Sequence, residues 1–148
     1  MQIKCEGYDC MLDYTNIVET LLQEFPKLNE RYAEDIDWIR STFENESSKG
    51  QTVYFDRCFC DYIGRSLVNL SEHSDELNHI FDFLEEMASS DDIEVQNLLQ
   101  VTVLEYLGSW YNLRLLSEPR MGNATKEMFD IIKRDFYNPQ PNQCFLGE

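Results

Sequence analysis

Apolar residues recur at steps of three and four along most of the chain, and this spacing constrains the fold more than any other feature. Such steps place side chains on one face of an α-helix, whereas a strand needs alternation, which is scarce here. The sequence therefore predicts an all-α fold with about six helices. We expect them near residues 8–25, 26–44, 53–70, 77–88, 93–110 and 124–137. The segment QTVYF (51–55) could instead open with a short strand.

The order of these helices suggests antiparallel hairpins, because short loops join neighbouring helices. A compact orthogonal bundle and a short solenoid-like stack both fit the pattern. The expected helix at 93–110 is apolar nearly all round, which is typical of a helix at the centre of a fold. We expect one domain over residues 1–148, with 138–148 as an extended tail, since two prolines exclude a helix there.

The charge balance excludes several classes of function. The chain carries a formal net charge of −16, so it lacks the basic stripes that bind nucleic acid or anionic membranes. Its first residues, MQIKCEGYDC, have no apolar run of the secretory kind, and no stretch is long enough to span a membrane. The five cysteines are irregularly spaced, which fits reduced thiols better than a disulfide framework. These features predict a cytoplasmic protein.

No motif in the sequence indicates catalysis. Cys58 and Cys60 are two residues apart, so on a helix they point in nearly opposite directions and would not hold one metal ion together. We expect Cys58 in the core and Cys60 on the far face. The only histidines are His73 and His79, and the pair Glu76 and His79 gives a single Glu-x-x-His where di-iron bundles need two. The sequence predicts no enzyme, no metal and no cofactor.

An uncompensated acidic segment is the strongest functional signal. The 48 residues between Arg65 and Arg114 contain ten carboxylates and no lysine or arginine. Ordinary exposed helices mix charges and gain from Glu–Lys pairs, which this segment forgoes. Phe83 and Trp38 lie off the apolar stripes among charged residues, as interface anchors do, although a second helix layer could cover either ring. The predicted partner-binding residues are Glu72, Asp75, Glu76, Asp82, Phe83, Glu86, Asp91 and Asp92.

A cluster of carboxylates suits a strongly basic partner, above all one that binds nucleic acid itself. Carboxylates can occupy the places of phosphates, and long-range attraction speeds association.

The same segment also contains a helix start, because Asp91 followed by Glu94 forms an Asp version of a capping box for the helix at 93–110.

Two stretches, VYFDRCFCDYIGRSLVNL (53–70) and DDIEVQNLLQVTVLEYLGSW (91–110), together with the size and acidity of the chain, carry a family resemblance. The chain resembles small all-helical immunity proteins of bacterial polymorphic-toxin and contact-dependent growth inhibition systems. These proteins share no common motif, so no residue is carried over from them. The resemblance implies an antitoxin that inhibits a basic toxin, a nuclease and an RNase in preference to a DNase, by covering its active site or substrate groove.

Two other functions stay open on the sequence. The chain could be a nucleic-acid mimic or regulatory adaptor that acts on a host nucleic-acid enzyme, which shares the chemistry and differs in partner. It could also be a small helical enzyme with an acidic metal site. The oligomeric state is left open, as is the choice between occlusion of an active site and binding beside it.

Overall fold

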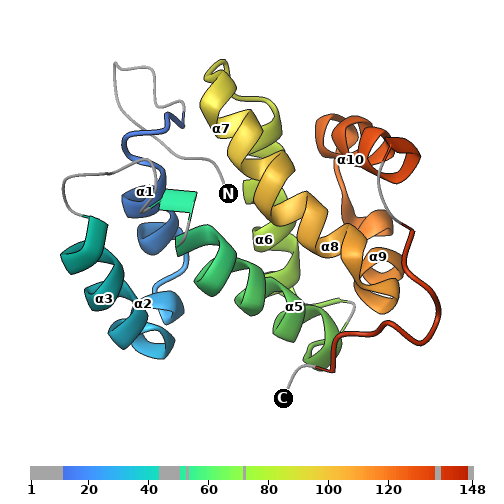
Figure 1. Ribbon diagram of the computed structural model, residues 1–148, viewed down its shortest axis with the longest axis horizontal. Coiled ribbons are helices and arrows are strands. Elements are labelled where there is room, and N and C mark those ends of the chain that lie inside the picture. The colour runs from blue at the N-terminus through green and yellow to red at the C-terminus, as the bar shows by residue number, and fades with distance from the viewer. Residues whose placement is uncertain (1–11, 44–50, 53, 72, 136–137, 147–148) are drawn as a thin grey trace.

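The computed structural model describes residues 12–43, 51–52, 54–71, 73–135 and 138–146, and within these residues the chain is all-α with no strand. The helices pack compactly in three groups, with α1 to α3 on one side, α5 to α8 across the middle, and α9 and α10 on the other side (Figure 1). The all-α prediction is confirmed, and residues 51, 52 and 54 are helical, so the alternative of a strand there is wrong.

The N-terminal helices are shorter than the sequence suggests. Helix α1 (Ile17–Glu24) starts late because the Asp13 side chain accepts hydrogen bonds from the amides of Thr15 (3.0 Å) and Asn16 (3.1 Å), which closes a turn. The single helix expected over 26–44 is two, α2 (Lys27–Arg31) and α3 (Ala33–Phe43), with a break at Tyr32. The Tyr32 hydroxyl donates to Asp61 (2.5 Å), which fixes the break against α5. The segment between the helices expected at 26–44 and 53–70 lies mostly outside the described residues.

The next helix is continuous from a π-helical turn, η1 (Phe55–Phe59), into α5 (Cys60–Asn69). The apolar residues that step by three and four along this helix (Phe55, Cys58, Phe59, Tyr62, Ile63 and Leu67) are buried, and only the last of the series, Leu70, is exposed. One expectation is wrong: Cys60 does not lie on a far, open face, because both Cys58 and Cys60 are fully buried. Elements pack on both sides of this end of the helix, including the central helix, so two opposite faces are enclosed.

Helix α6 (Asp75–Ala88) starts at Ser74, whose hydroxyl accepts from the amide of Glu76 (3.2 Å). The apolar spacing of the sequence places six residues on the inner face of this helix, and all six are buried: Leu77, Ile80, Phe81, Leu84, Met87 and Ala88.

The central helix joins α7 (Ile93–Leu98), a π-helical stretch η2 (Leu99–Leu104) and α8 (Glu105–Ser109) without interruption. It contacts α6, α10 and η1 and crosses the middle of the molecule, as its apolar sequence predicts (Figure 1). Its N-cap is Asp92, whose Oδ1 accepts from the Glu94 amide (2.9 Å), so the prediction that Asp91 forms the cap is wrong by one residue.

A short helix that the sequence pattern did not separate follows a break at Trp110. Helix α9 (Tyr111–Ser117) runs into a 3₁₀ turn, η3 (Glu118–Arg120), and then α10 (Asn123–Asp135) packs against α6. Residues 138–146 are not helical and lie along the body. There the Tyr111 amide donates to Gln143 O (2.7 Å), and Phe145 packs against Tyr106 and Trp110.

Candidate partner-binding surface

The seven predicted site residues that the structure describes separate into three groups by burial. Asp75, Asp82 and Asp91 are exposed, and Glu76, Glu86 and Asp92 are half-buried. Phe83 is buried. Glu72 lies outside the described residues. The acidic segment therefore contains surface carboxylates and structural carboxylates side by side in sequence.

Phe83 is not an interface anchor, because its side chain is only 2% exposed. Its ring meets the edges or faces of Phe25 (5.6 Å between centroids) and Phe59 (6.0 Å) at nearly right angles. The chain just after α1 and the π-helical turn η1 therefore cover this flank of α6, as the second-layer alternative supposed. Edge-to-face aromatic contacts of this kind stabilise a core.

Trp38 keeps its exposed position, with 48% of its surface open to solvent. The Arg57 guanidinium lies over its ring at 5.5 Å and also pairs with Asp35 (3.1 Å). Trp38 lies on α3, away from α6, so it belongs to a different face from the predicted acidic site.

Asp92 has a structural role as well as the cap. Its second oxygen, Oδ2, accepts from the Tyr14 amide (2.8 Å), and the neighbouring Ser90 hydroxyl donates to Leu12 O (2.9 Å). These bonds tie the turn before α1 to the start of the central helix across 78 residues of sequence. Both carboxylate oxygens of Asp92 therefore accept hydrogen bonds within the fold.

The Glu76 carboxylate also has partners within the fold. Its carboxylate pairs with Lys27 (3.1 Å) and takes part in a hydrogen bond with Tyr62. Burial, with that bond and the nearby carboxylate charge, raises the pKa of Tyr62 above its ordinary value, so the phenol stays protonated as a donor. Glu76 therefore contributes to the contact between α2, α5 and α6.

Glu85 caps a helix that is far from it in sequence. Its carboxylate accepts from the amides of Ala124 (3.0 Å) and Thr125 (3.0 Å) and from the Thr125 hydroxyl (2.8 Å), at the N-terminus of α10. Burial alone would raise the pKa of Glu85, but these three bonds outweigh burial and hold that pKa below its usual value. This charge therefore joins α6 to α10.

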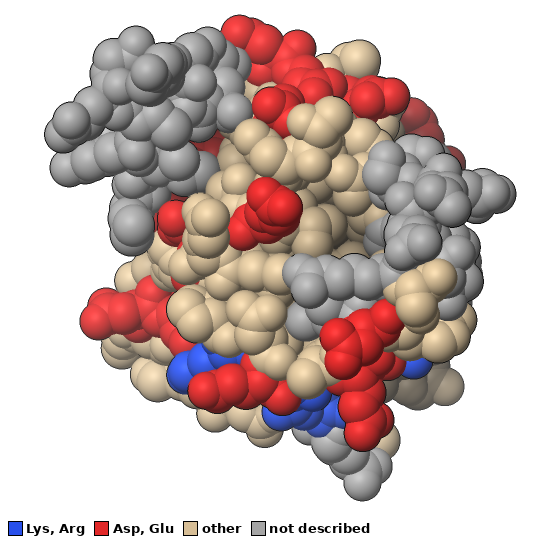
Figure 2. Space-filling model, turned by 90° about the vertical axis from the view of Figure 1, so that its left-hand side faces the viewer, with Lys and Arg blue, Asp and Glu red and all other residues tan. Residues whose placement is uncertain are grey.

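The carboxylates that remain on the surface form what we call the α6–α7 acidic surface: Asp75, Asp82, Asp91 and Glu94. Asp75 and Asp82 are seven residues apart, so they share one face of α6, and Asp91 and Glu94 follow at its far end. Acidic excess is not confined to this surface. The face formed by α1 to α3 also shows separated groups of acidic side chains, with basic ones only along its lower part (Figure 2).

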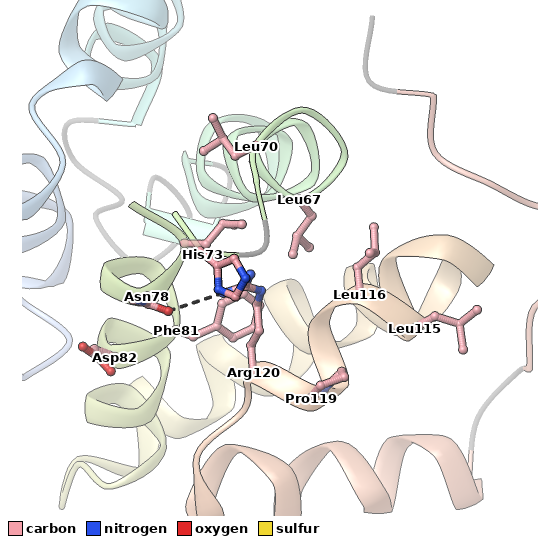
Figure 3. Close-up of a pocket in the computed structure, with 11 residues that line it drawn as sticks. Leu67, Leu70, His73, Asn78, Phe81, Asp82, Leu115, Leu116, Pro119 and Arg120 are labelled. Carbon is pink, nitrogen blue, oxygen red and sulfur yellow. Dashed lines mark hydrogen bonds between the residues drawn. The ribbon is translucent and has the colours of Figure 1, made fainter. Parts of the chain in front are cut away.

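A groove of about 860 Å³ adjoins the acidic surface (Figure 3). Its walls come from the end of α5, the first half of α6, and α9 with η3. Leu116 of α9 faces Leu67 of α5 across it, Phe81 forms part of its base, and Asp82 lies at its outer edge. The Arg120 guanidinium reaches across to Asn78 Oδ1 (3.4 Å). We call this cavity the leucine groove.

The sequence analysis did not predict the leucine groove, because it assigned no element to the residues of α9. A partial signal was the adjacent pair Leu115 and Leu116, because neighbouring residues of a helix point about 100° apart and cannot both follow the stripe of Leu113. Two adjacent leucines outside the buried stripe of a short helix indicate an apolar surface.

No group of three or more His, Cys, Asp or Glu side chains in the described part of the chain could hold a metal ion. Burial, helped by the charge of Asp35, raises the pKa of the Cys58 thiol to about 12, which keeps it protonated and unreactive. His79 lies against the Phe25 ring, with Nε2 3.3 Å from a Glu24 carboxylate oxygen.

Fold and surface together define a class: a compact all-helical domain with an acidic surface beside an apolar groove. Residues 18–138 match the model of a domain of unknown function, DUF7674, and the chain belongs to that family. Comparison with curated proteins finds no significant match, and comparison with solved structures finds none. No helix in the described part of the chain is both long enough and apolar enough to cross a bilayer.

Proposed function

We propose that this domain is a cytoplasmic immunity protein that binds and inhibits a basic toxin domain. The toxin we expect is a nuclease, an RNase in preference to a DNase, whose active site or substrate groove the domain covers. One observation carries the proposal. The α6–α7 acidic surface stays open to solvent within a segment that contains no lysine or arginine, even after the structural carboxylates are set aside.

Carboxylates gathered in a segment without lysine or arginine are costly for an isolated domain, because like charges repel one another. They become favourable when a basic surface approaches. The long-range field then raises the association rate, and charge pairs that lose their water slow dissociation. A nuclease binds phosphates with clustered lysines and arginines, so it presents the complementary surface.

The test uses charge reversal at the surface. The chain serves as bait in a pull-down from the source cell at low and high salt, beside an Asp75→Lys/Asp82→Lys variant. The matched control is Glu34→Lys/Asp37→Lys, which changes the same net charge on two exposed residues of α3. We expect a basic toxin domain bound one-to-one by the wild type and the control, and at least tenfold weaker binding by the α6 variant.

Two results would contradict the proposal. Equal losses in both variants would show that net charge, and not this surface, governs binding. Capture of host nucleic-acid enzymes in place of a toxin would favour the nucleic-acid mimic or regulatory adaptor.

A further inference from the structure

The leucine groove concentrates apolar surface on a molecule whose net charge is −16. Of the eight large hydrophobic residues that are exposed in the described part of the chain, three line it: Leu70 (40% exposed), Leu115 (57%) and Leu116 (42%). Scattered exposed leucines are ordinary, but three that gather at one hollow, beside the polar side chains of Asn78, Asp82 and Arg120, mark a candidate interaction site. Its volume of about 860 Å³ also lies in the range of ligand-binding cavities.

The two sides of the groove differ in charge. The α5 and α6 sides belong to the segment without lysine or arginine, and Asp82 lies at the α6 edge in the row that begins with Asp75. The opposite side carries Arg120, which lies within hydrogen-bond distance of Asn78. A guest would therefore meet leucines in the middle and carboxylates along α6.

We propose that the leucine groove is the docking site for an amphipathic segment of the basic partner, with apolar side chains between α6 and α9 and lysines or arginines along Asp75 and Asp82. This inference rests on the proposed function and specifies what the partner presents. Segments that lay an apolar face in a hydrophobic groove are a common mode of recognition.

Charge complementarity selects this occupant over the other candidates. A second copy of the chain would bring another surface of net charge −16 toward the first, which opposes association. An anionic lipid surface is repelled for the same reason. A segment with a basic face gains from both the leucines and the aspartates.

The first test uses a synthetic helical peptide of about 18 residues, with leucines on one face and lysines on the other. Its control has the same composition, with the leucines spread around the helix. Both are titrated onto the full chain at about 0.15 M NaCl, where unspecific attraction is screened beyond about 8 Å. We expect the amphipathic peptide to bind at least about tenfold more tightly than the control. Equal binding would overturn the proposal.

Two variants test whether the amphipathic peptide binds in the leucine groove. Leu115→Ser/Leu116→Ser should reduce the binding of the amphipathic peptide to the level of the control peptide. Ile131→Ser, at an exposed position of α10 outside the groove, should leave binding unchanged. The substituted leucines are exposed, and circular dichroism checks that the fold is kept. If the leucine variant folds and binds as the wild type does, the groove is not the site.

A second measurement needs no variant. The chain has two histidines: His73 lines the groove, and His79 packs against Phe25. Proton NMR should show the His73 ring signals shifting with the amphipathic peptide while those of His79 stay in place. The reverse pattern would overturn the assignment, as would a chain dimer that dissociates in the leucine variant.

The failure of this inference is distinguishable from the failure of the proposed function. If the pull-down recovers a toxin that binds Leu115→Ser/Leu116→Ser normally but loses affinity for Asp75→Lys/Asp82→Lys, the inhibitor proposal holds and the groove proposal falls. If no basic toxin binds the wild type, the proposed function is contradicted as well.

Discussion

At the scale of the residue, the carboxylates in the segment without cations divide by their hydrogen bonds. Glu85 and Asp92 each accept bonds from backbone amides of segments far away in sequence, whereas Asp75 and Asp82 are exposed. A carboxylate that caps a distant helix contributes to stability, because charged acceptors form the stronger hydrogen bonds. Replacement of Glu85 or Asp92 should therefore affect stability, and replacement of Asp75 or Asp82 should not.

Glu85→Gln should lower the free energy of unfolding by about 1–3 kcal/mol at neutral pH, because the cap of α10 loses its charge. The pKa of Glu85 is below its ordinary value of 4.5 in the folded state, so its contribution is complete above that pH and is lost as the pH falls through the lowered pKa. The difference between wild type and variant should shrink below about pH 4.5.

Denaturant unfolding at several pH values measures this difference. Glu127→Gln, an exposed residue of the same helix, is the control and should unfold like the wild type at each pH. A gap between wild type and Glu85→Gln that stays constant into acid would contradict the assigned role.

The Glu85 carboxylate also leaves no room for a side chain at position 122, which is a glycine. A Cβ at this position would lie 2.5 Å from Glu85 Cδ, so Gly122→Ala should displace the carboxylate and cost about 1–2 kcal/mol. In a double-mutant cycle, Gly122→Ala should cost little once Glu85→Gln is present, since both remove one interaction. Gly108→Ala is the control: its Cβ would make ordinary 3.5 Å contacts with Ile132 and Phe129, so no comparable loss is expected. Additive effects in the cycle would refute the shared cause.

At the scale of the element, one side chain of α9 makes two hydrogen bonds to the segment 138–146. Asn112 of α9 accepts from the Phe145 amide (2.8 Å) and donates to Phe145 O (2.8 Å), and the Phe145 ring packs against Tyr106 and Trp110. The tail thus completes the surface of α5, α8 and α9 without being a helix.

Asn112→Ala should release this tail. We expect faster hydrogen exchange at the Phe145 amide, by the factor that corresponds to about 1–3 kcal/mol of lost local stability, and faster trimming by carboxypeptidase. Asn97→Ala, at an exposed position on α7, should change neither rate. Unchanged exchange at Phe145 would show that the ring contacts alone hold the tail.

Helical periodicity predicted the type of nearly every element and the inner stripe of α6 residue by residue, because burial on one face is written into the spacing of apolar residues. It did not predict the break at Tyr32 or the separate helix α9. Both depend on partners distant in sequence: Tyr32 bonds to Asp61, and residues 111 and 112 bond to the tail. The prediction that Phe83 is an interface anchor was wrong for a related reason, because the elements that cover its ring come from elsewhere in the chain.

At the scale of the whole molecule, the net charge of −16 works against the compact state. Raising NaCl from about 0.01 M to about 1 M shortens the Debye length from about 30 Å to about 3 Å, so mutual repulsion weakens. We expect the melting temperature of the free chain to rise with salt, although the surface pairs of Lys126 and Lys133 with Glu118 and Asp130 weaken at the same time.

Thermal unfolding followed by circular dichroism measures this rise. Asp75→Asn/Asp82→Asn should show a smaller increase with salt, because it carries two fewer charges. A melting temperature that falls with salt would mean that attractive pairs dominate the electrostatics of the domain.

The division between fastening and surface carboxylates has a consequence for how the family can diverge. Positions 85 and 92 join distant segments, whereas positions 75, 82, 115 and 116 are exposed to solvent. Descendants of one ancestor could exchange the second set freely while keeping the first, and so acquire new partners on an unaltered scaffold. Family members should therefore vary most along the edge of α6 and on the outer side of α9.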